Sequence, residues 1–343
     1  MKSSNSHKTM IPEVEKKIVS ILRVLKESRE PVGARVLSRK LQEFGVNLSE
    51  RAVRYHLKIM DEKGLTTLEG KRNGRVITKQ GIDEIKNARV GDKIGFAISR
   101  IEILSFKTTF DPEKKRGLIP VNISLFPREK FKRALKAMKP AFFKGICISD
   151  FIAVAHEGEK LGDITVPEGN VGLATVCSII INGTLLKAGI PMDSRFGGIL
   201  QVKDKRPLRF VELIHYTGSS LDPSEAFIRG KMTSVRDVVK KGEGKILANF
   251  REIPSICYTL VEEVLEKLKG AGIGGIIMIG DVSEPVCEIP VDLNKAGMIL
   301  AGGLNPVAYV QEMGIESENL AMSTLIDYGK MIRYPEFLKE FSP

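Results

Sequence analysis

The sequence is poor in the residues that build metal sites and disulfides. It has no tryptophan, 6% aromatic residues and only four cysteines, Cys147, Cys177, Cys257 and Cys287, which stand far apart without a C-x-x-C pair. No histidine stands at ligand spacing from any of them, which argues against a zinc site. We expect reduced thiols and no bound metal ion.

Membrane-directed and catalytic patterns are also missing. No uncharged run reaches the roughly 18 residues that a membrane span requires, and no apolar signal segment follows the N-terminus. No G-x-S-x-G, Walker or H-E-x-x-H pattern occurs, and the glycine-rich segment 270–275 follows an expected helix, the reverse of a dinucleotide site. We expect a cytoplasmic protein that has no membrane partner and is not an enzyme.

Acidic residues are scarce only near the N-terminus. Residues 1–90 contain 20 Lys plus Arg against 11 Asp plus Glu, whereas the other 253 residues contain 33 against 31. The net charge of +11 therefore belongs mainly to the N-terminal quarter. This asymmetry indicates a polyanion-binding module joined to a near-neutral body.

The N-terminal quarter has the pattern of a winged helix. Apolar residues recur at helical spacing in segments 12–29, 33–44 and 49–63, and β-branched runs at 65–68 and 76–78 flank a glycine-rich, cationic turn. The second and third segments form a helix-turn-helix, the hairpin is its wing, and a short helix follows from Thr78 to Ala88. We therefore predict a DNA-binding domain over residues 1–88.

Cations lie on the face of the third helix opposite its apolar stripe. A basic helix fits the major groove of duplex DNA while a cationic wing reaches phosphates or the minor groove. The alternative is a solvated charged helix beside an ordinary hairpin. The predicted DNA contacts are Ser49, Arg51, Arg54, Tyr55, Lys58, Lys71, Arg72 and Arg75.

The remainder of the chain reads as a connector followed by a duplicated αβ domain. Residues 89–117 are expected to form a connecting helix, with a strand as the alternative, and a hairpin. Segments 118–232 and 246–331 then show the same order of strands and helices, with Pro127 and Pro254 opening equivalent helices. Convergence of two ordinary αβ units is the alternative. The fold class is therefore α/β (α+β), and a cleft between the two halves of residues 118–343 is the expected ligand site.

Glycines, hydroxyls and cations in and near the first repeat suit a small anionic ligand. A strand that enters a helix near Cys177 would direct free N–H groups outward, and Arg195 would clamp a carboxylate. The alternative makes Cys177 a core residue and the glycines turn formers. The predicted ligand contacts are Thr175, Cys177, Ser178, Asn182, Gly183, Arg195, Gly197, Gly198, Thr233 and Arg251.

Four motifs together resemble the NrpR family of archaeal nitrogen regulators. They are TVCSIIINGTLLKAGIP (175–191), RFGG (195–198), RGKMTSV (229–235) and ANFREIP (248–254). The resemblance implies a repressor of nitrogen-assimilation genes that binds a palindromic operator in double-stranded DNA as a homodimer and is released by the effector 2-oxoglutarate. Some members carry two effector domains whereas this chain has room for one, which leaves open a second NrpR-type partner protein.

Two other interpretations remain open at this point. The αβ domain would sense a different metabolite, or would serve only for dimerisation and partner binding. In an enzymatic interpretation Cys177 would be a nucleophile, which requires a low thiol pKa.

Overall fold

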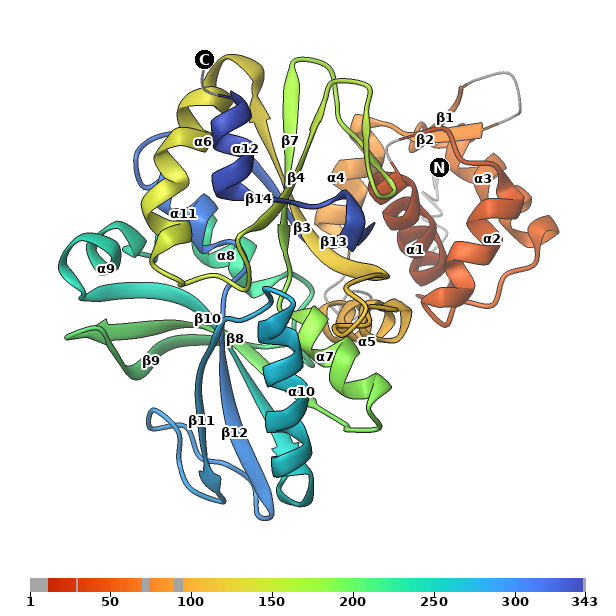
Figure 1. The fold of residues 1–343 in the computed structure, drawn as a ribbon. Coiled ribbons are helices and arrows are strands. Elements are labelled where there is room, and N and C mark those ends of the chain that lie inside the picture. The colour runs from red at the N-terminus through yellow and green to blue at the C-terminus, as the bar shows by residue number, and fades with distance from the viewer. Residues whose placement is uncertain (1–11, 29, 70–73, 89–94, 342–343) are drawn as a thin grey trace, which may run out of the picture. The chain divides into compact units, whose positions relative to one another are not determined.

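The computed structural model describes residues 12–28, 30–69, 74–88 and 95–341. The chain divides into two compact units, Met1–Lys93 and Ile94–Pro343 (Figure 1). Within the described ranges, no helix is both long and apolar enough to cross a bilayer.

The first unit is a winged helix, as predicted. Its elements are α1 (Pro12–Ser28), α2 (Ala34–Glu43), α3 (Glu50–Glu62), β1 (Thr66–Glu69), β2 (Gly74–Ile77) and α4 (Lys79–Asn87). Leu22, Leu37 and Leu57 are fully buried between α1, α2 and α3, and the β1–β2 hairpin follows α3 directly. The apolar stripes of three short helices therefore make one core.

The start of α3 is defined by a single capping residue. The Ser49 hydroxyl oxygen accepts a hydrogen bond from the Ala52 N–H at 3.2 Å, and the helix ends before Gly64, which has φ +69°. Asn47 and Ser49 both have side chains that could cap this helix, and the structure has Ser49 as the N-cap. Such caps satisfy backbone groups that the first and last turns leave free.

The second unit contains two antiparallel five-stranded sheets. One has the order β13-β3-β7-β4-β14 and the other β11-β12-β10-β8-β9, in separate halves of the unit (Figure 1). The strands are β3 (Leu118–Pro127), β4 (Phe151–His156), β7 (Asn170–Val176), β8 (Asp193–Lys203), β9 (Arg206–His215), β10 (Gly244–Pro254), β11 (Ile276–Val282), β12 (Lys295–Ala301), β13 (Glu318–Asp327) and β14 (Ile332–Arg333), with a small separate hairpin of β5 (Lys160–Leu161) and β6 (Ile164–Thr165).

Helices cover these sheets and join their strands. They are α5 (Phe96–Lys107), α6 (Arg128–Phe143), α7 (Ile179–Lys187), α8 (Pro223–Arg229), α9 (Val235–Lys241), α10 (Tyr258–Gly270), α11 (Asn305–Gln311) and α12 (Tyr334–Phe341). Helix α6 buries Phe131, Leu135 and Met138, and α10 buries Val261 and Leu268 in the two main hydrophobic cores.

The strand order confirms the internal duplication and adds a feature that the sequence did not predict. The first repeat runs β3-α6-β4-β7-α7-β8, and the second runs β10-α10-β11-β12-α11-β13 in the same order. The last strand of each repeat leaves its own sheet, so that β8 pairs with β10 and β13 pairs with β3. The two repeats therefore exchange strands and share their cores.

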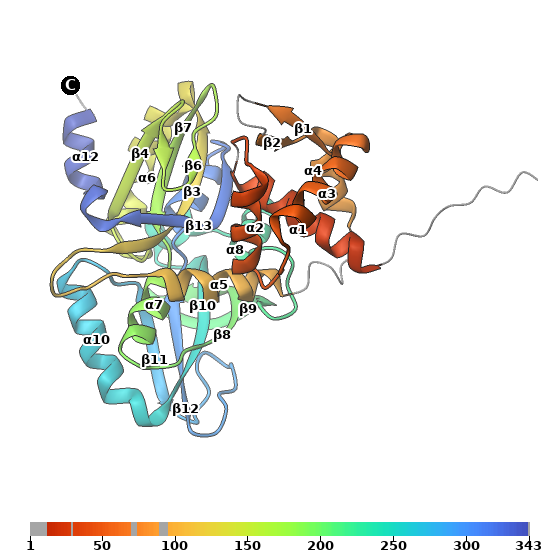
Figure 2. The ribbon, with the colours of Figure 1, turned by 90° about the vertical axis from the view of Figure 1, so that its right-hand side faces the viewer.

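The apolar pattern of residues 146–154 predicts a strand, but β4 begins only at Phe151. A short strand is likewise predicted before Pro290, where the structure has a single bridge between Val286 and Ile289. The segment predicted to connect the domains contains a helix, α5, as expected, but this helix packs beside α7 within the second unit (Figure 2). Its apolar side consequently belongs to a core of the second unit.

Candidate functional site

One face of α3 presents the predicted DNA-binding side chains to solvent. Arg51, Arg54, Tyr55 and Lys58 are exposed, whereas Val53, Leu57 and Met60 on the other side are fully buried. Arg54 forms an ion pair with Glu50 one turn earlier, and exposed pairs of this kind are weak. The face therefore remains cationic and accessible.

The wing differs from the prediction at Arg75. This residue lies on β2 rather than at the tip, and its guanidinium contacts the Asp61 carboxylate of α3 at 3.2 Å. Arg75 thus fixes the wing to α3, because its charge is already paired. The predicted contacts Lys71 and Arg72 lie outside the described residues.

A buried histidine, His56, lies on the inner face of α3. The pKa of His56 is lowered by its burial and by the nearby charge of Lys17, so the imidazole is neutral at pH 7. Its side chain lies in the apolar interior and its Nδ1 atom has no hydrogen-bond partner among the described residues.

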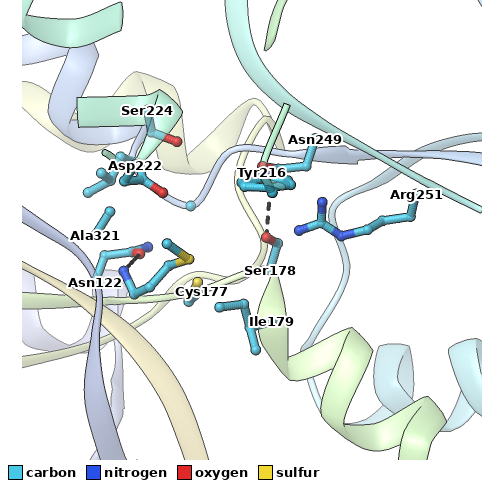
Figure 3. Close-up of a pocket in the computed structure, with 13 residues that line it drawn as sticks. Asn122, Cys177, Ser178, Ile179, Tyr216, Asp222, Ser224, Asn249, Arg251 and Ala321 are labelled. Carbon is cyan, nitrogen blue, oxygen red and sulfur yellow. Dashed lines mark hydrogen bonds between the residues drawn. The ribbon is translucent and has the colours of Figure 1, made fainter. Parts of the chain in front are cut away.

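A cavity of about 310 Å³, counted with its opening, lies where the two repeats of the second unit meet (Figure 3). Its wall contains residues at equivalent places in both repeats, because Asn122 and Asn249 are separated by 127 residues, and Ser178 and Gly303 by 125. The cavity is therefore one site built by both repeats.

Arg251 on β10 supplies a buried positive charge to this cavity. Its side chain is fully buried, lies over the Tyr216 ring at 4.9 Å, and donates a hydrogen bond to the Phe250 carbonyl at 3.3 Å. Within the described residues it forms no ion pair, and its Nε atom has no hydrogen-bond partner. A buried unpaired charge costs several kcal/mol, so this guanidinium is suited to an anionic ligand.

Neutral polar groups complete the wall around Arg251. Asn249 accepts a hydrogen bond from the Tyr216 hydroxyl at 2.5 Å and donates one to the Ser178 hydroxyl at 3.3 Å. Asn122 accepts one from the Met322 N–H at 3.0 Å (Figure 3). These amides and hydroxyls are oriented before any ligand enters, which lowers the entropic cost of binding.

Burial controls the ionisation of the cavity's acidic groups. It raises the pKa of the Cys177 thiol to about 12 and that of the Tyr216 hydroxyl to about 12, and it raises the pKa of the Asp222 carboxyl. Cys177 is therefore a neutral thiol at pH 7, which removes the basis for its prediction as a nucleophile. Asp222 also caps α8 by accepting a hydrogen bond from the Glu225 N–H at 3.1 Å.

Of the ten predicted ligand contacts, three line the cavity, namely Cys177, Ser178 and Arg251. Thr175, Asn182 and Gly183 are buried outside the cavity wall. The Thr175 hydroxyl has no partner among the described residues, and Asn182 donates to the Ser194 hydroxyl at 3.0 Å. Gly183 packs on Thr108, where an added Cβ would come within 2.5 Å of the Thr108 Cβ.

The structure corrects the role predicted for Arg195. Its guanidinium lies within 3.5 Å of three carboxylates of the protein itself, those of Glu252, Asp292 and Asp193, and Lys295 joins the same network. With these partners Arg195 is not free to clamp a ligand carboxylate.

The remaining predicted contacts have structural partners instead. Thr233 donates a hydrogen bond to Glu312 at 2.7 Å. Gly197 lies against Pro223 and Gly198 against Phe210. A Cβ atom added to either glycine would come within 3 Å of a side-chain carbon of that neighbour. The two glycines therefore permit close packing of the protein on itself rather than on a ligand.

Sequence reasoning missed most of the cavity wall. The missed residues are Asn122, Ile179, Tyr216, Asp222, Ser224, Asn249, Gly303, Leu304, Ala321 and Met322. The repeat offset is the signal that could have found the two asparagines, because both stand five residues before the proline that opens a helix. Among the described residues no group of three or more His, Cys, Asp or Glu is placed to hold a metal ion.

Comparisons with family models match both units separately. A model of NrpR regulatory domains NRD1 and 2 matches residues 94–333, and a model of the ribonuclease R winged-helix domain matches residues 19–85. The first match covers the whole duplicated unit with its cavity, and the second covers α3 and its wing.

Named relatives extend the similarity to nearly the whole chain. A global nitrogen regulator NrpRI of Methanosarcina mazei is 42% identical over 322 residues, 94% of this chain and 99% of the relative. A global nitrogen regulator NrpR of Methanococcus maripaludis is 32% identical over 91% of this chain, which spans only 54% of that relative. A crystal structure of a nitrogen repressor-like protein from Methanococcus jannaschii, 28% identical, matches with a TM-score of 0.59 over 69% of this chain and 98% of its own.

Proposed function

The chain belongs to the NrpR family of nitrogen-regulating transcriptional repressors, and from this premise we propose that it binds a palindromic operator as a homodimer and releases it when 2-oxoglutarate occupies the cavity of the second unit. The proposed regulated genes are those of nitrogen assimilation. This proposal assigns the DNA to the exposed face of α3 and the effector to the residues around Arg251.

The buried guanidinium of Arg251 is the observation that carries the effector assignment. A dicarboxylate would supply the negative charge that this group lacks, and a carboxylate can accept two parallel N–H bonds from an arginine. The amides of Asn122 and Asn249 and the hydroxyl of Ser178 would then serve the second carboxylate and the ketone. Burial raises the pKa of the Asp222 carboxyl, which reduces its repulsion of an anionic ligand beside it.

The release of DNA requires only a modest coupling energy. About 1.4 kcal/mol of difference in effector affinity between the DNA-binding and non-binding states weakens operator binding tenfold. In a dimer, two recognition helices must match half-sites about one helical turn apart, so a small change in their spacing provides this energy.

The effector assignment is tested with Arg251→Met in the full chain. Replacing a buried unpaired charge by an apolar side chain of similar volume is neutral or stabilising. We therefore expect the variant to lose 2-oxoglutarate affinity by about a hundredfold or more in calorimetry, to keep or raise its melting temperature, and to keep operator binding in a mobility shift that 2-oxoglutarate no longer reverses.

Arg195→Met is the matched control for this experiment. It removes an arginine from the neighbouring strand whose charge is paired with three carboxylates, so it should lower the melting temperature and leave effector affinity unchanged. A wild-type chain that binds no 2-oxoglutarate, or an Arg251→Met variant that binds it normally, would refute the effector assignment.

Asp222 favours a second candidate, an amino-acid effector. A carboxylate on the cavity wall opposite Arg251 would suit the ammonium group of glutamate or glutamine, whose carboxylate would meet the guanidinium (Figure 3). Calorimetry with 2-oxoglutarate, glutamate and glutamine in parallel separates the two. Binding of none of them would favour a second unit used for dimerisation and partner binding, including a second NrpR-type protein.

A further inference from the structure

A bulge in β13 forms part of the cavity wall. Strand β13 pairs with β3 at Leu320 and again at Thr324, so the three residues between them leave the regular ladder. Ala321 and Met322 of this bulge line the cavity, and Met322 has a φ of +48°. A non-glycine residue with positive φ is strained and persists only because its surroundings hold it.

Three side chains from three different elements hold the bulge. The Asn122 amide oxygen on β3 accepts from the Met322 N–H at 3.0 Å, and the Glu225 carboxylate on α8 accepts from the Ala321 N–H at 2.8 Å. Arg100 on α5 donates to the Met322 carbonyl at 2.8 Å and also to the Ser323 carbonyl. The same short segment therefore contacts the cavity on one side and α5 on the other.

Helix α5 also packs directly behind the cavity. Its residues Ala97, Ile101 and Leu104 form one buried cluster with four cavity residues, Cys177, Ile179, Tyr216 and Met322. No glycine or proline interrupts the helix between Phe96 and Lys107. A displacement of the cavity wall would consequently move α5 as a rigid element, because packed interiors transmit strain.

Helix α5 is the first helix after the chain leaves the winged-helix unit, which ends at Lys93. We propose that α5 transmits effector binding to the winged helix. The two hydrogen bonds from Arg100 to the β13 bulge are the contact that couples the cavity to α5. This inference rests on the proposed function. An effector carboxylate can only accept hydrogen bonds, so it competes with the Asn122 amide oxygen for the Met322 N–H. The strained bulge then shifts together with the carbonyls that Arg100 holds.

The test is Arg100→Ala in the full chain, because Arg100 does not line the cavity. We expect 2-oxoglutarate affinity, and operator affinity without effector, to stay within about threefold of wild type. The ratio of operator dissociation constants with and without saturating 2-oxoglutarate should fall from about tenfold or more toward one. Arg100→Lys should be intermediate, because one ammonium cannot reproduce the fork that serves two carbonyls.

Glu102→Ala is the control on the same helix. Glu102 is exposed and points away from the bulge by about half a turn from Arg100, so this variant should respond to 2-oxoglutarate as wild type does. An Arg100→Ala variant with normal effector response would overturn the inference, whereas a wild-type chain without 2-oxoglutarate binding would overturn the proposed function.

Hydrogen exchange on the wild-type chain gives an independent test should Arg100→Ala fail to fold. We expect 2-oxoglutarate to change the exchange rates of amides in α5 and in residues 321–323. Unchanged rates in both segments at saturating effector would overturn the inference, since a coupling element must differ between the two states.

Discussion

Arg251 and Arg195 stand on adjacent strands of one sheet and have opposite electrostatic surroundings. Arg251 is buried without a carboxylate partner, whereas Arg195 contacts three. The adjacent residues Arg251 and Glu252 point to opposite faces of β10, and Arg195 pairs with Glu252. A single step along β10 thus separates the charge that we propose binds the effector from the carboxylate that holds Arg195 in its network.

At the residue scale, His56 predicts a pH dependence of the winged-helix unit. Its pKa in the folded unit lies below the ordinary histidine value of 6.5, so the unfolded chain binds the proton more readily. The neutral His56 therefore contributes its full share to the free energy of unfolding above pH 6.5. This contribution is lost as the pH falls through the lower pKa of the folded unit. We expect amide exchange in α3, corrected for intrinsic rates, to show lower stability at about pH 6 than at about pH 7.5.

The control for this prediction is His56→Gln, which cannot titrate. It should remove most of the pH dependence between these two values. An equal loss of α3 protection in wild type and variant would assign the effect to other groups.

At the element scale, α3 combines a buried stripe with an exposed cationic face. Arg51 and Lys58 are exposed and make no ion pair within the described part of the chain. We expect Lys58→Ala to weaken binding to operator and non-operator DNA alike. It should also reduce by about one the slope of log affinity against log salt concentration. Arg51→Ala should cost about 1–3 kcal/mol on the operator if it reads a base edge.

Lys26→Ala serves as the control for α3, because it removes an equal charge from an exposed position on α1. Fluorescence anisotropy with operator and scrambled duplexes over a salt series measures all three variants. If Lys26→Ala and Lys58→Ala lowered DNA affinity equally, the net charge of the unit, and not the face of α3, would be responsible for DNA binding.

At the scale of the whole molecule, strand exchange makes the two repeats interdependent. Strand β8 has its partner β10 in the second repeat, and β3 has its edge partner β13 there. We expect a chain truncated after residue 233 to leave its second unit unfolded, because β8 and β3 would each lose a neighbour and both cores would lose a wall.

Calorimetry of the full chain checks this expectation. The second unit should unfold in one transition, so that at most two transitions appear for the molecule. Two separate transitions assigned by hydrogen exchange to residues 118–232 and 246–331 would contradict it.

Local patterns were sufficient for most of the elements. The apolar stripes of α1, α2 and α3, the caps at Ser49 and Thr78, and the prolines before α6 and α10 are all readable from neighbouring residues. These signals depend on interactions within one or two turns, which is why the winged helix and the order of both repeats could be predicted. The cationic face of α3 follows from the same periodicity.

The cavity wall required contacts between residues that are far apart in the chain. Asn122 and Met322 meet across 200 residues because β13 crosses to the sheet of the first repeat, and Arg251 faces the cavity because of its register against β8. Sequence spacing does not show which distant strands pair. It also does not show the bulge between β8 and β10, where Phe250 pairs with Phe196 and Arg251 pairs with Ser194, so that Arg195 is skipped. The sequence therefore determined the elements and their charges, while only the tertiary structure decided which of those charges share a site.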